Sequence, residues 1–359
     1  MKQLVAILLC AAILTALFSA CSPARETASA PETPGSQTES TQTESTQTES
    51  TQTASSQTQN KPAQQPAFTF QPKVASVYLY EVYGEDMVQT WFNIVDAVLA
   101  GEDSFACPDQ ETYDWRIYQF SDRCFPCFVG LFREDVDRPV ENGVGHLLYT
   151  STKEERETKI AAFEELVVDI INKTIKPEYT DMEKALALYK YFCDTYRYDY
   201  DTSNKMEEEF VEYLSSYRLL TTGTGVCQEI SSAYSYLLMQ VGVDATIMMG
   251  DWHQWSYVRI NGKNYHIDPT FALENSDSLE FFMMNDEKRD ETYPSDRHII
   301  VGAYAQEHEH PDYVADDDTF RPIWNAFYER FDHAAHLIHG YTLDDNGESV
   351  PMTFDYAGF

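Results

Sequence analysis

Three residues in the second half of the chain have the types and the order that thiol acyl-transfer chemistry requires: Cys227, His253 and Asp268. A cysteine thiolate can attack a carbonyl carbon, and an imidazole can carry the proton to the leaving group. A carboxylate can hold that imidazole in one tautomer. The segment from residue 223 to 271 therefore predicts a nucleophilic site, provided that the fold brings the three side chains together.

The residues after Cys227 predict a buried helix that begins at the cysteine. Apolar residues recur at helical spacing from Ile230 to Val241, and Gly242 supplies the stop. The amides and the positive dipole at a helix start favour a thiolate and can bind an oxyanion. Because a cysteine before an apolar helix is common, this pattern alone does not identify an enzyme.

A β-hairpin is predicted to carry the other two residues. The dipeptide Asn261-Gly262 is the preferred two-residue hairpin turn. Counting back from it pairs Trp255 with Asp268, and places His253 diagonal to Asp268 on the same face. The alternative is an incidental histidine–aspartate surface pair, which would leave the glycine-rich approach to Cys227 and its apolar helix unexplained.

These motifs resemble the transglutaminase-like superfamily. The segments that carry the resemblance are Gly225-Val-Cys227, Ser232-Ala-Tyr234, Gly242, His253-Gln-Trp255 and Tyr265-His-Ile-Asp268-Pro-Thr270. The resemblance covers about residues 157–285 and implies an α+β fold of the papain type, with the cysteine helix packed on an antiparallel β-sheet and extensions at both ends. It also implies that Cys227 is the nucleophile, His253 the general base and then acid, and Asp268 the orienting carboxylate.

The sequence departs from this family at the group that stabilises the oxyanion. Animal transglutaminases use an upstream tryptophan, and residues 116–251 contain none. Papain-type proteases use a glutamine six positions before the cysteine, where this chain has Thr221. We expect the amide of Cys227 to act with a second donor, for which Tyr198 and Tyr200 are candidates.

Aromatic residues near the triad are candidates for substrate contacts. Trp252, Trp255 and Tyr198 could wall the cleft, although the tryptophans could equally be core residues. No cofactor and no metal are predicted. The histidines His333, His336 and His339 lack an acidic or cysteine partner at an ordered spacing, so we expect solvated side chains near the end of a helix over residues 321–339.

The chain start has the features of an exported bacterial lipoprotein. Lys2 and the apolar run up to Phe18 form a secretion signal over residues 1–20, and Ser19-Ala20-Cys21 resembles a lipoprotein cleavage site with Cys21 as the lipidated residue. Plain signal cleavage is the alternative. Residues 21–66 form a Ser/Thr/Gln-rich tether that cannot bury enough apolar surface to fold, and a flexible chain of about 44 residues spans roughly 35–40 Å.

Three further segments follow the tether. Residues 67–150 are expected to be a β-rich region, with strands at 74–83, 116–120 and 127–132 and a helix at 87–99. Residues 151–285 form the predicted catalytic core, which opens with helices at 152–173 and 181–194. Residues 286–359 are a C-terminal extension that packs on the core, with a strand at 299–304, the helix at 321–339 and a final hairpin or strand.

Charge and cysteine content restrict the partners. The formal net charge of −34 disfavours nucleic acid and anionic membrane surfaces, so membrane contact is expected only through the lipid anchor.

Once Cys10 leaves with the signal and Cys21 is lipidated, an odd set of five cysteines remains, for which Cys227 is the expected free thiol. The pair Cys124 and Cys127 is read as a structural disulfide or as two buried thiols, and Cys193 as a core residue.

The function predicted from these features is an exported, membrane-anchored enzyme that attacks a carboxamide or peptide bond and passes through a thioester. Its partner is a protein or peptide substrate. Two alternatives stay open: a cell-wall peptide hydrolase with the same triad, and a surface binding module without turnover.

Overall fold

The computed structural model describes residues 68–359, apart from 207–213, 274–276, 293, 295–297 and 301–310, with residues 115–119 described by backbone alone. The predicted signal, the tether and the lipidation site Cys21 lie outside the described residues. Within these, no helix combines the length and the apolar character needed to cross a bilayer.

The region before residue 150 contains more helix than strand. Its elements are α2 (Val77–Tyr83), α3 (Glu85–Ala100), β1 (Ser104–Ala106), α4 (Gln110–Cys124), the 3₁₀ turn η1 (Pro126–Phe128), β2 (Phe132–Glu134) and β3 (Val144–Tyr149). The strands form a small antiparallel sheet in the order β1-β3-β2. The helix predicted at 87–99 is confirmed, and the expectation of a β-rich region is wrong.

The strand predicted at 74–83 is the helix α2. Ser76 caps it, because its hydroxyl accepts a hydrogen bond from the Tyr78 amide at 3.2 Å. The buried residues of α2 are Tyr78, Leu79, Val82 and Tyr83, a spacing that fits one helical face. The chain leaves the helix at Gly84, whose φ of 83° suits glycine.

The other two strands predicted in this region are also wrong for most of their length. Residues 116–120 lie inside α4, which is capped by Asp109 through a 2.8 Å hydrogen bond from the Thr112 amide. Residues 127–132 begin in η1 and reach β2 only at Phe132. A local capping residue outweighs short apolar alternation in both α2 and α4.

The core around the predicted site is an antiparallel sheet with helices packed on it, as the α+β fold class requires. Its elements are α5 (Lys153–Thr174), α6 (Asp181–Thr195), β4 (Arg197–Tyr198), α7 (Tyr200–Met206), α8 (Ser216–Thr222), β5 (Thr224–Gly225), α9 (Cys227–Gln240), β6 (Asp244–Met249), β7 (Gln254–Ile260), β8 (Lys263–Ile267), α10 (Pro269–Ala272), α11 (Asp286–Thr292) and β9 (Ile299–Ile300). The sheet order is β8-β7-β6-β9. The helices predicted at 152–173, 181–194 and after Cys227 are confirmed, and of the strand predicted at 299–304 only β9 lies in the described residues.

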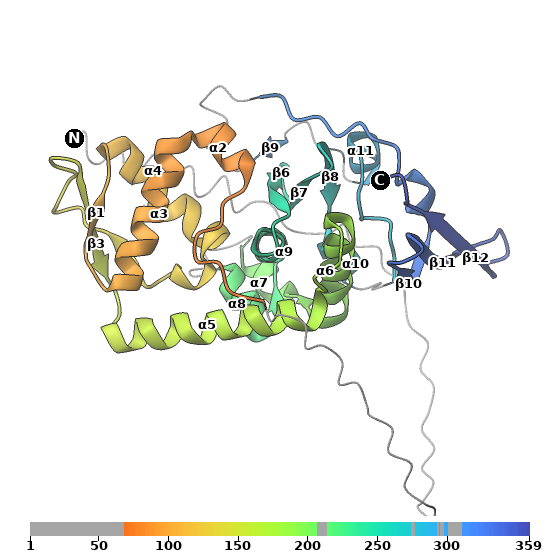
Figure 1. Ribbon diagram of the computed structural model, residues 1–359, viewed down its shortest axis with the longest axis horizontal. Helices are drawn as coiled ribbons and strands as arrows, with labels where there is room; N and C mark the ends of the chain where they lie inside the picture. The colour runs from red at the N-terminus through yellow and green to blue at the C-terminus, as the bar shows by residue number, and fades with distance from the viewer. Residues whose placement is uncertain (1–67, 207–213, 274–276, 293, 295–297, 301–310) are drawn as a thin grey trace, which may run out of the picture. The chain divides into compact units, whose positions relative to one another are not determined.

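Helix α9 packs against strands β6 and β7 and also against α6 (Figure 1). On the sheet side, the Ser235 hydroxyl donates to the Thr246 carbonyl at 2.8 Å and lies 3.0 Å from the Ser256 hydroxyl. On the other side, the Tyr234 hydroxyl donates to the Ala185 carbonyl at 2.8 Å. Since nearly every side chain of α9 is buried, this helix has little freedom to move relative to the strands.

The C-terminal region is a three-stranded antiparallel sheet, so the helix predicted at 321–339 is wrong. It contains η2 (Arg321–Ile323), β10 (Phe327–Asp332), β11 (Leu337–Leu343) and β12 (Ser349–Asp355), in the order β10-β11-β12. A β-carbon on Gly340 would lie 2.0 Å from the Phe327 carbonyl oxygen, so this close approach of two strands requires glycine. The predicted final hairpin or strand is confirmed by β12.

This sheet contacts the core at a buried carboxylate. Glu183 in the first turn of α6 accepts hydrogen bonds from the Tyr356 hydroxyl at 2.6 Å and from His333 Nδ1 at 2.9 Å. Burial by itself raises the pKa of Glu183, but these hydrogen bonds and one from the Thr180 amide outweigh it and leave the pKa lowered. His333 therefore links the C-terminal sheet to α6 and is not a solvated histidine at a helix end.

Candidate active site

The hairpin that carries His253 and Asp268 has the register predicted from its turn. Asn261 and Gly262 both have positive φ, 53° and 75°, as a type I′ turn requires. Ile260 pairs with Lys263, and the pairing continues without a shift along β7 and β8. Asp268 follows directly after β8, and His253 precedes β7.

The structure brings the His253 imidazole against the Asp268 carboxylate. His253 Nε2 donates to Asp268 Oδ2 at 2.6 Å. The second carboxylate oxygen accepts the Thr270 amide at 2.9 Å and caps α10. Since Asp268 is fully buried and both oxygens have a partner, the carboxylate can hold only one imidazole orientation.

Cys227 is the first residue of α9, and Gln254 fixes this end of the helix to the strand that follows His253. Gln254 Nε2 donates to the Ser231 hydroxyl at 3.0 Å and to the Gln228 carbonyl at 3.4 Å. The Ser256 hydroxyl donates to the Ser231 carbonyl at 3.0 Å. The start of α9 and the start of β7 are therefore joined by side chains on both elements.

A buried ion pair holds the loop that leads into Cys227. The Glu229 carboxylate is fully buried and accepts the amides of Ser215 at 2.9 Å and Val226 at 3.0 Å. Arg218 donates to both Glu229 oxygens, with Nε at 2.8 Å. Arg218 Nη1 also donates to Asp199 at 2.8 Å, which extends the network to the residue after Tyr198.

Tyr198 reaches the Cys227 end of α9. Its strand β4 pairs in parallel with β5, with Tyr198 opposite Gly225. The Tyr198 hydroxyl lies near the Cys227 amide and 3.3 Å from the Ser203 hydroxyl. Burial is the main cause that raises the pKa of Tyr198, so the hydroxyl keeps its proton and can donate it in a hydrogen bond.

The cysteines differ from the sequence expectation. Cys227 is disulfide-bonded in this structure, so the expectation that it is the free thiol is wrong for this form. The remaining described cysteines, Cys107, Cys124, Cys127 and Cys193, are buried thiols. Of the two alternatives predicted for Cys124 and Cys127, two buried thiols is therefore correct. Any chemistry at Cys227 requires the reduced protein.

The aromatic residues beside His253 have different environments. Trp252 is 39% exposed, which suits a substrate contact, whereas Trp255 is 0% exposed and cannot line an open cleft. The Trp255 ring instead stacks beside His253, with centroids 6.0 Å apart and planes at 19°. Phe271 contacts the imidazole at 4.7 Å between centroids, so two aromatic rings adjoin His253.

Sequence reasoning assigned no role to Arg218, Glu229, Gln254 or His266. The signal for Glu229 was its third position in the helix, where a carboxylate accepts the amide before the helix start. Gly225 was a second signal, because a β-carbon there would lie 3.1 Å from Glu229 Oε2 and 2.9 Å from Leu219 Cδ1. Arg218 and His266 act through partners that are distant in sequence, which no local pattern reveals.

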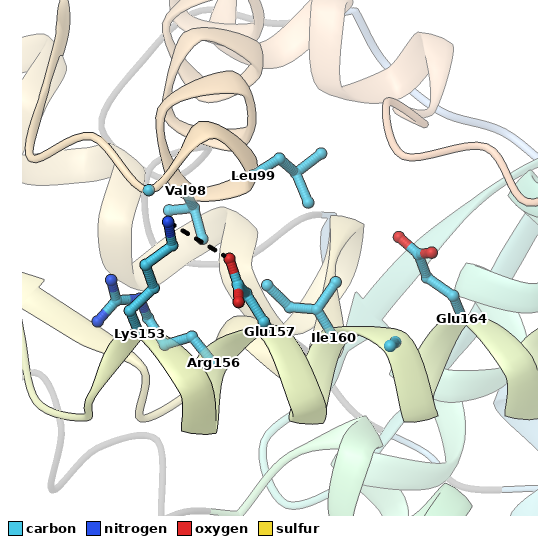
Figure 2. Close-up of a pocket in the computed structure, with 9 residues that line it drawn as sticks. Val98, Leu99, Lys153, Arg156, Glu157, Ile160 and Glu164 are labelled. Carbon is cyan, nitrogen blue, oxygen red and sulfur yellow. Dashed lines mark ion pairs between the residues drawn. The ribbon is translucent and has the colours of Figure 1, made fainter.

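A small surface cavity of about 150 Å³ lies between α3 and α5, where Lys153 and Glu157 form an exposed ion pair at 3.7 Å (Figure 2). None of its lining residues belongs to the elements that carry the candidate triad. Among the described residues, no three His, Cys, Asp or Glu side chains are grouped so that they could hold a metal ion.

Comparison with known proteins supports the family resemblance. Residues 168–283 match the family model of the Transglutaminase-like superfamily. Two solved structures are similar: a candidate cysteine protease from Cytophaga hutchinsonii (18% identity, TM-score 0.25, 30% of this chain and 37% of that one) and a TGase (16% identity, TM-score 0.28, 37% and 42%). The chain thus spans about two fifths of the solved proteins it resembles, and no curated protein matches it.

Proposed function

We propose, on the premise of a transglutaminase-like core in residues 168–283, that this chain is a thiol acyl-transfer enzyme with Cys227, His253 and Asp268 as its catalytic triad. The observation that carries the proposal is the buried 2.6 Å hydrogen bond between His253 and Asp268. It lies beside a helix whose first residue is the cysteine. A fold with a buried imidazole–carboxylate pair at a cysteine helix start has the parts that covalent acyl transfer needs.

In the proposed reaction, His253 Nδ1 takes the Cys227 proton, while Nε2 remains hydrogen-bonded to Asp268. The thiolate sulfur bonds to the carbonyl carbon of a carboxamide or peptide. The carbon–nitrogen bond then breaks as His253 returns the proton to the leaving amine, which leaves a thioester. Water or an amine attacks this thioester, gives a proton to His253, and releases the thiolate when the carbon–sulfur bond breaks.

Tyr198 is the proposed partner of the Cys227 amide in binding the oxyanion. Its hydroxyl already contacts that amide, so a substrate oxygen entering there would meet one N–H donor and one O–H donor. This assignment replaces the upstream tryptophan of animal transglutaminases. Trp252 is the proposed substrate contact at the rim, since it is exposed and adjacent to His253. Export and anchoring through Cys21 remain part of the proposal.

The test is the rate at which iodoacetamide alkylates Cys227 in the reduced full-length protein, measured against pH and located by mass spectrometry. A cysteine–imidazole ion pair gives a rate plateau well below the ordinary thiol pKa of about 8.5, and His253→Ala abolishes it. Ordinary thiol behaviour in both proteins would contradict the proposal and favour a binding module.

The acceptor is identified by a second assay on the same protein. A fluorescent primary amine and a glutamine-containing protein report amine transfer, whereas new amino groups released from cell-wall peptides report hydrolysis. Cys227→Ala is the control in both assays, since it removes the nucleophile and must abolish either product.

A further inference from the structure

A buried chain of hydrogen bonds lies behind the candidate base and has no part in the proposed reaction. Trp255 Nε1 donates to His266 Nδ1 at 2.8 Å. His266 Nε2 in turn donates to Asp286 Oδ1 at 2.8 Å. Trp255 is also the residue whose ring stacks beside His253.

Each link fixes the donor and acceptor roles of the next. Asp286 is held by Ala315, whose amide donates to Asp286 Oδ2 at 3.0 Å and whose carbonyl accepts the Asp286 amide at 2.7 Å. A carboxylate at Nε2 requires the Nε2–H tautomer of His266, which leaves Nδ1 as an acceptor for the indole N–H. The opposite tautomer, or a protonated ring, would place two N–H groups face to face.

The surroundings of His266 keep it neutral. It is 1% exposed, and Arg289 and His298 face it as well as Asp286, while the Tyr257 ring contacts it at 4.7 Å. Burial lowers the pKa of His266 to about 4, and the hydrogen bond to Asp286 offsets only part of that effect. At neutral pH the ring therefore accepts from Trp255 and donates to Asp286 at the same time.

We propose that His266 is a positioning residue that holds Trp255, and through it the plane of the His253 imidazole. His253 precedes strand β7, is hydrogen-bonded to Asp268 and contacts the rings of Trp255 and Phe271. A tryptophan that could tilt would no longer hold the imidazole plane against rotation about the hydrogen bond to Asp268. This role rests on the proposed function, because it concerns delivery of a proton to Cys227.

Two substitutions separate the links of the chain. The amide of asparagine reaches the place of Nδ1, so His266→Asn keeps an acceptor for Trp255 but loses Asp286. The amide of glutamine reaches the place of Nε2, so His266→Gln keeps Asp286 but leaves the indole N–H without its acceptor. Trp255→Phe keeps a ring beside His253 and removes the N–H, so it reports on the same link without altering His266.

The measurement is the alkylation rate of Cys227 against pH in the reduced full-length protein. We expect His266→Gln and Trp255→Phe to lower the rate at pH 6 about tenfold and to erode the low-pH plateau, since misplacing a reacting group by about 1 Å can cost a hundredfold. His266→Asn should recover the rate to within about threefold of the native protein. Equal rates and equal pH profiles in all variants would overturn the proposal and leave His266 a core residue.

Two observations keep the outcome interpretable. Nitrogen-15 NMR of the histidine rings in the unmutated protein should show His266 as the Nε2–H tautomer, and a Nδ1–H ring would refute the chain of bonds even if no variant folds. If the unmutated protein has no low-pH plateau, the triad proposal fails by itself. If the plateau is present and unaffected by Trp255→Phe, only the positioning role fails.

Discussion

At the scale of single residues, the site depends on groups that already have two partners. Asp268 binds His253 through one oxygen and the Thr270 amide through the other, so its side chain is committed at both ends. The Tyr198 hydroxyl likewise has two polar neighbours, the amide of Cys227 and, at 3.3 Å, the Ser203 hydroxyl. Such residues tolerate isosteric replacement poorly, because the replacement changes a hydrogen-bonding atom and so disturbs at least one of the two contacts.

We therefore expect Asp268→Asn to abolish the low-pH alkylation plateau although it preserves shape. If the amide nitrogen faces His253, it forces the wrong tautomer, and if it faces Thr270, it removes the cap of α10. The rate at pH 6 should fall by about a hundredfold or more. The measurement is the pH profile of Cys227 alkylation, and a profile equal to that of the native protein would show that Asp268 does not orient the base.

Tyr198→Phe should leave alkylation of Cys227 nearly unchanged but lower kcat on any acyl substrate. Loss of one oxyanion donor lowers kcat about a hundred- to a thousandfold. Alkylation forms no oxyanion, so its rate does not depend on this donor. Tyr200→Phe is the matched control, because Tyr200 is the other tyrosine that the sequence suggests as the donor, and since it is 46% exposed we expect its change to leave kcat unaffected. An equal kcat for native protein and Tyr198→Phe would assign the second donor elsewhere.

At the scale of elements, the loop before α9 is held by the carboxylate of Glu229, which is buried away from water. Glu229 is fully buried, and Arg218 is its cationic partner. Gly225 lets the loop pass within van der Waals contact of the carboxylate, which explains why no larger residue occupies that position. The ion pair thus fixes the path of the chain into Cys227.

Glu229→Gln should destabilise the protein by about 3 kcal/mol, because it leaves the Arg218 charge without its main partner and turns a donor toward an amide. The matched control is Glu157→Gln, which breaks the exposed pair with Lys153 and should change the free energy of unfolding by less than about 0.5 kcal/mol. Urea unfolding measures both, and equal effects would contradict the role assigned to the buried pair.

At the scale of the whole molecule, the C-terminal sheet is joined to the core at Glu183. A carboxyl whose pKa is lowered by folding contributes stability that is present above its unfolded pKa and is lost as pH falls through the folded pKa. We expect the stability difference between native protein and Glu183→Gln to be full above about pH 5 and to shrink below about pH 4. Urea unfolding at pH 7, 5 and 3.5 checks this, and a difference independent of pH would contradict it.

The elements that the sequence predicted correctly are those defined by local rules. The helix after Cys227, the capped helices α5 and α6, and the register set by Asn261-Gly262 all follow from periodicity, caps and turn geometry. The helix predicted at 321–339 failed because its apolar spacing fits two periods, and pairing with β12 decides between them. The chain through Trp255 and His266 could not be predicted, because α11 and residue 315 supply its far end.

The start of the described chain is fixed at the end of α9 opposite to Cys227. The Gln71 amide donates to the Gln240 side chain at 3.1 Å, and Gln240 donates back to the Gln71 carbonyl at 2.8 Å. Gln240 ends α9, and a helix of this length separates it from Cys227 by roughly 20 Å. A bead, a fusion partner or a fluorophore joined close to Gln71 would thus lie at the Gln240 end of α9, and the protein could be immobilised there with the Cys227 end of the helix turned away from the support.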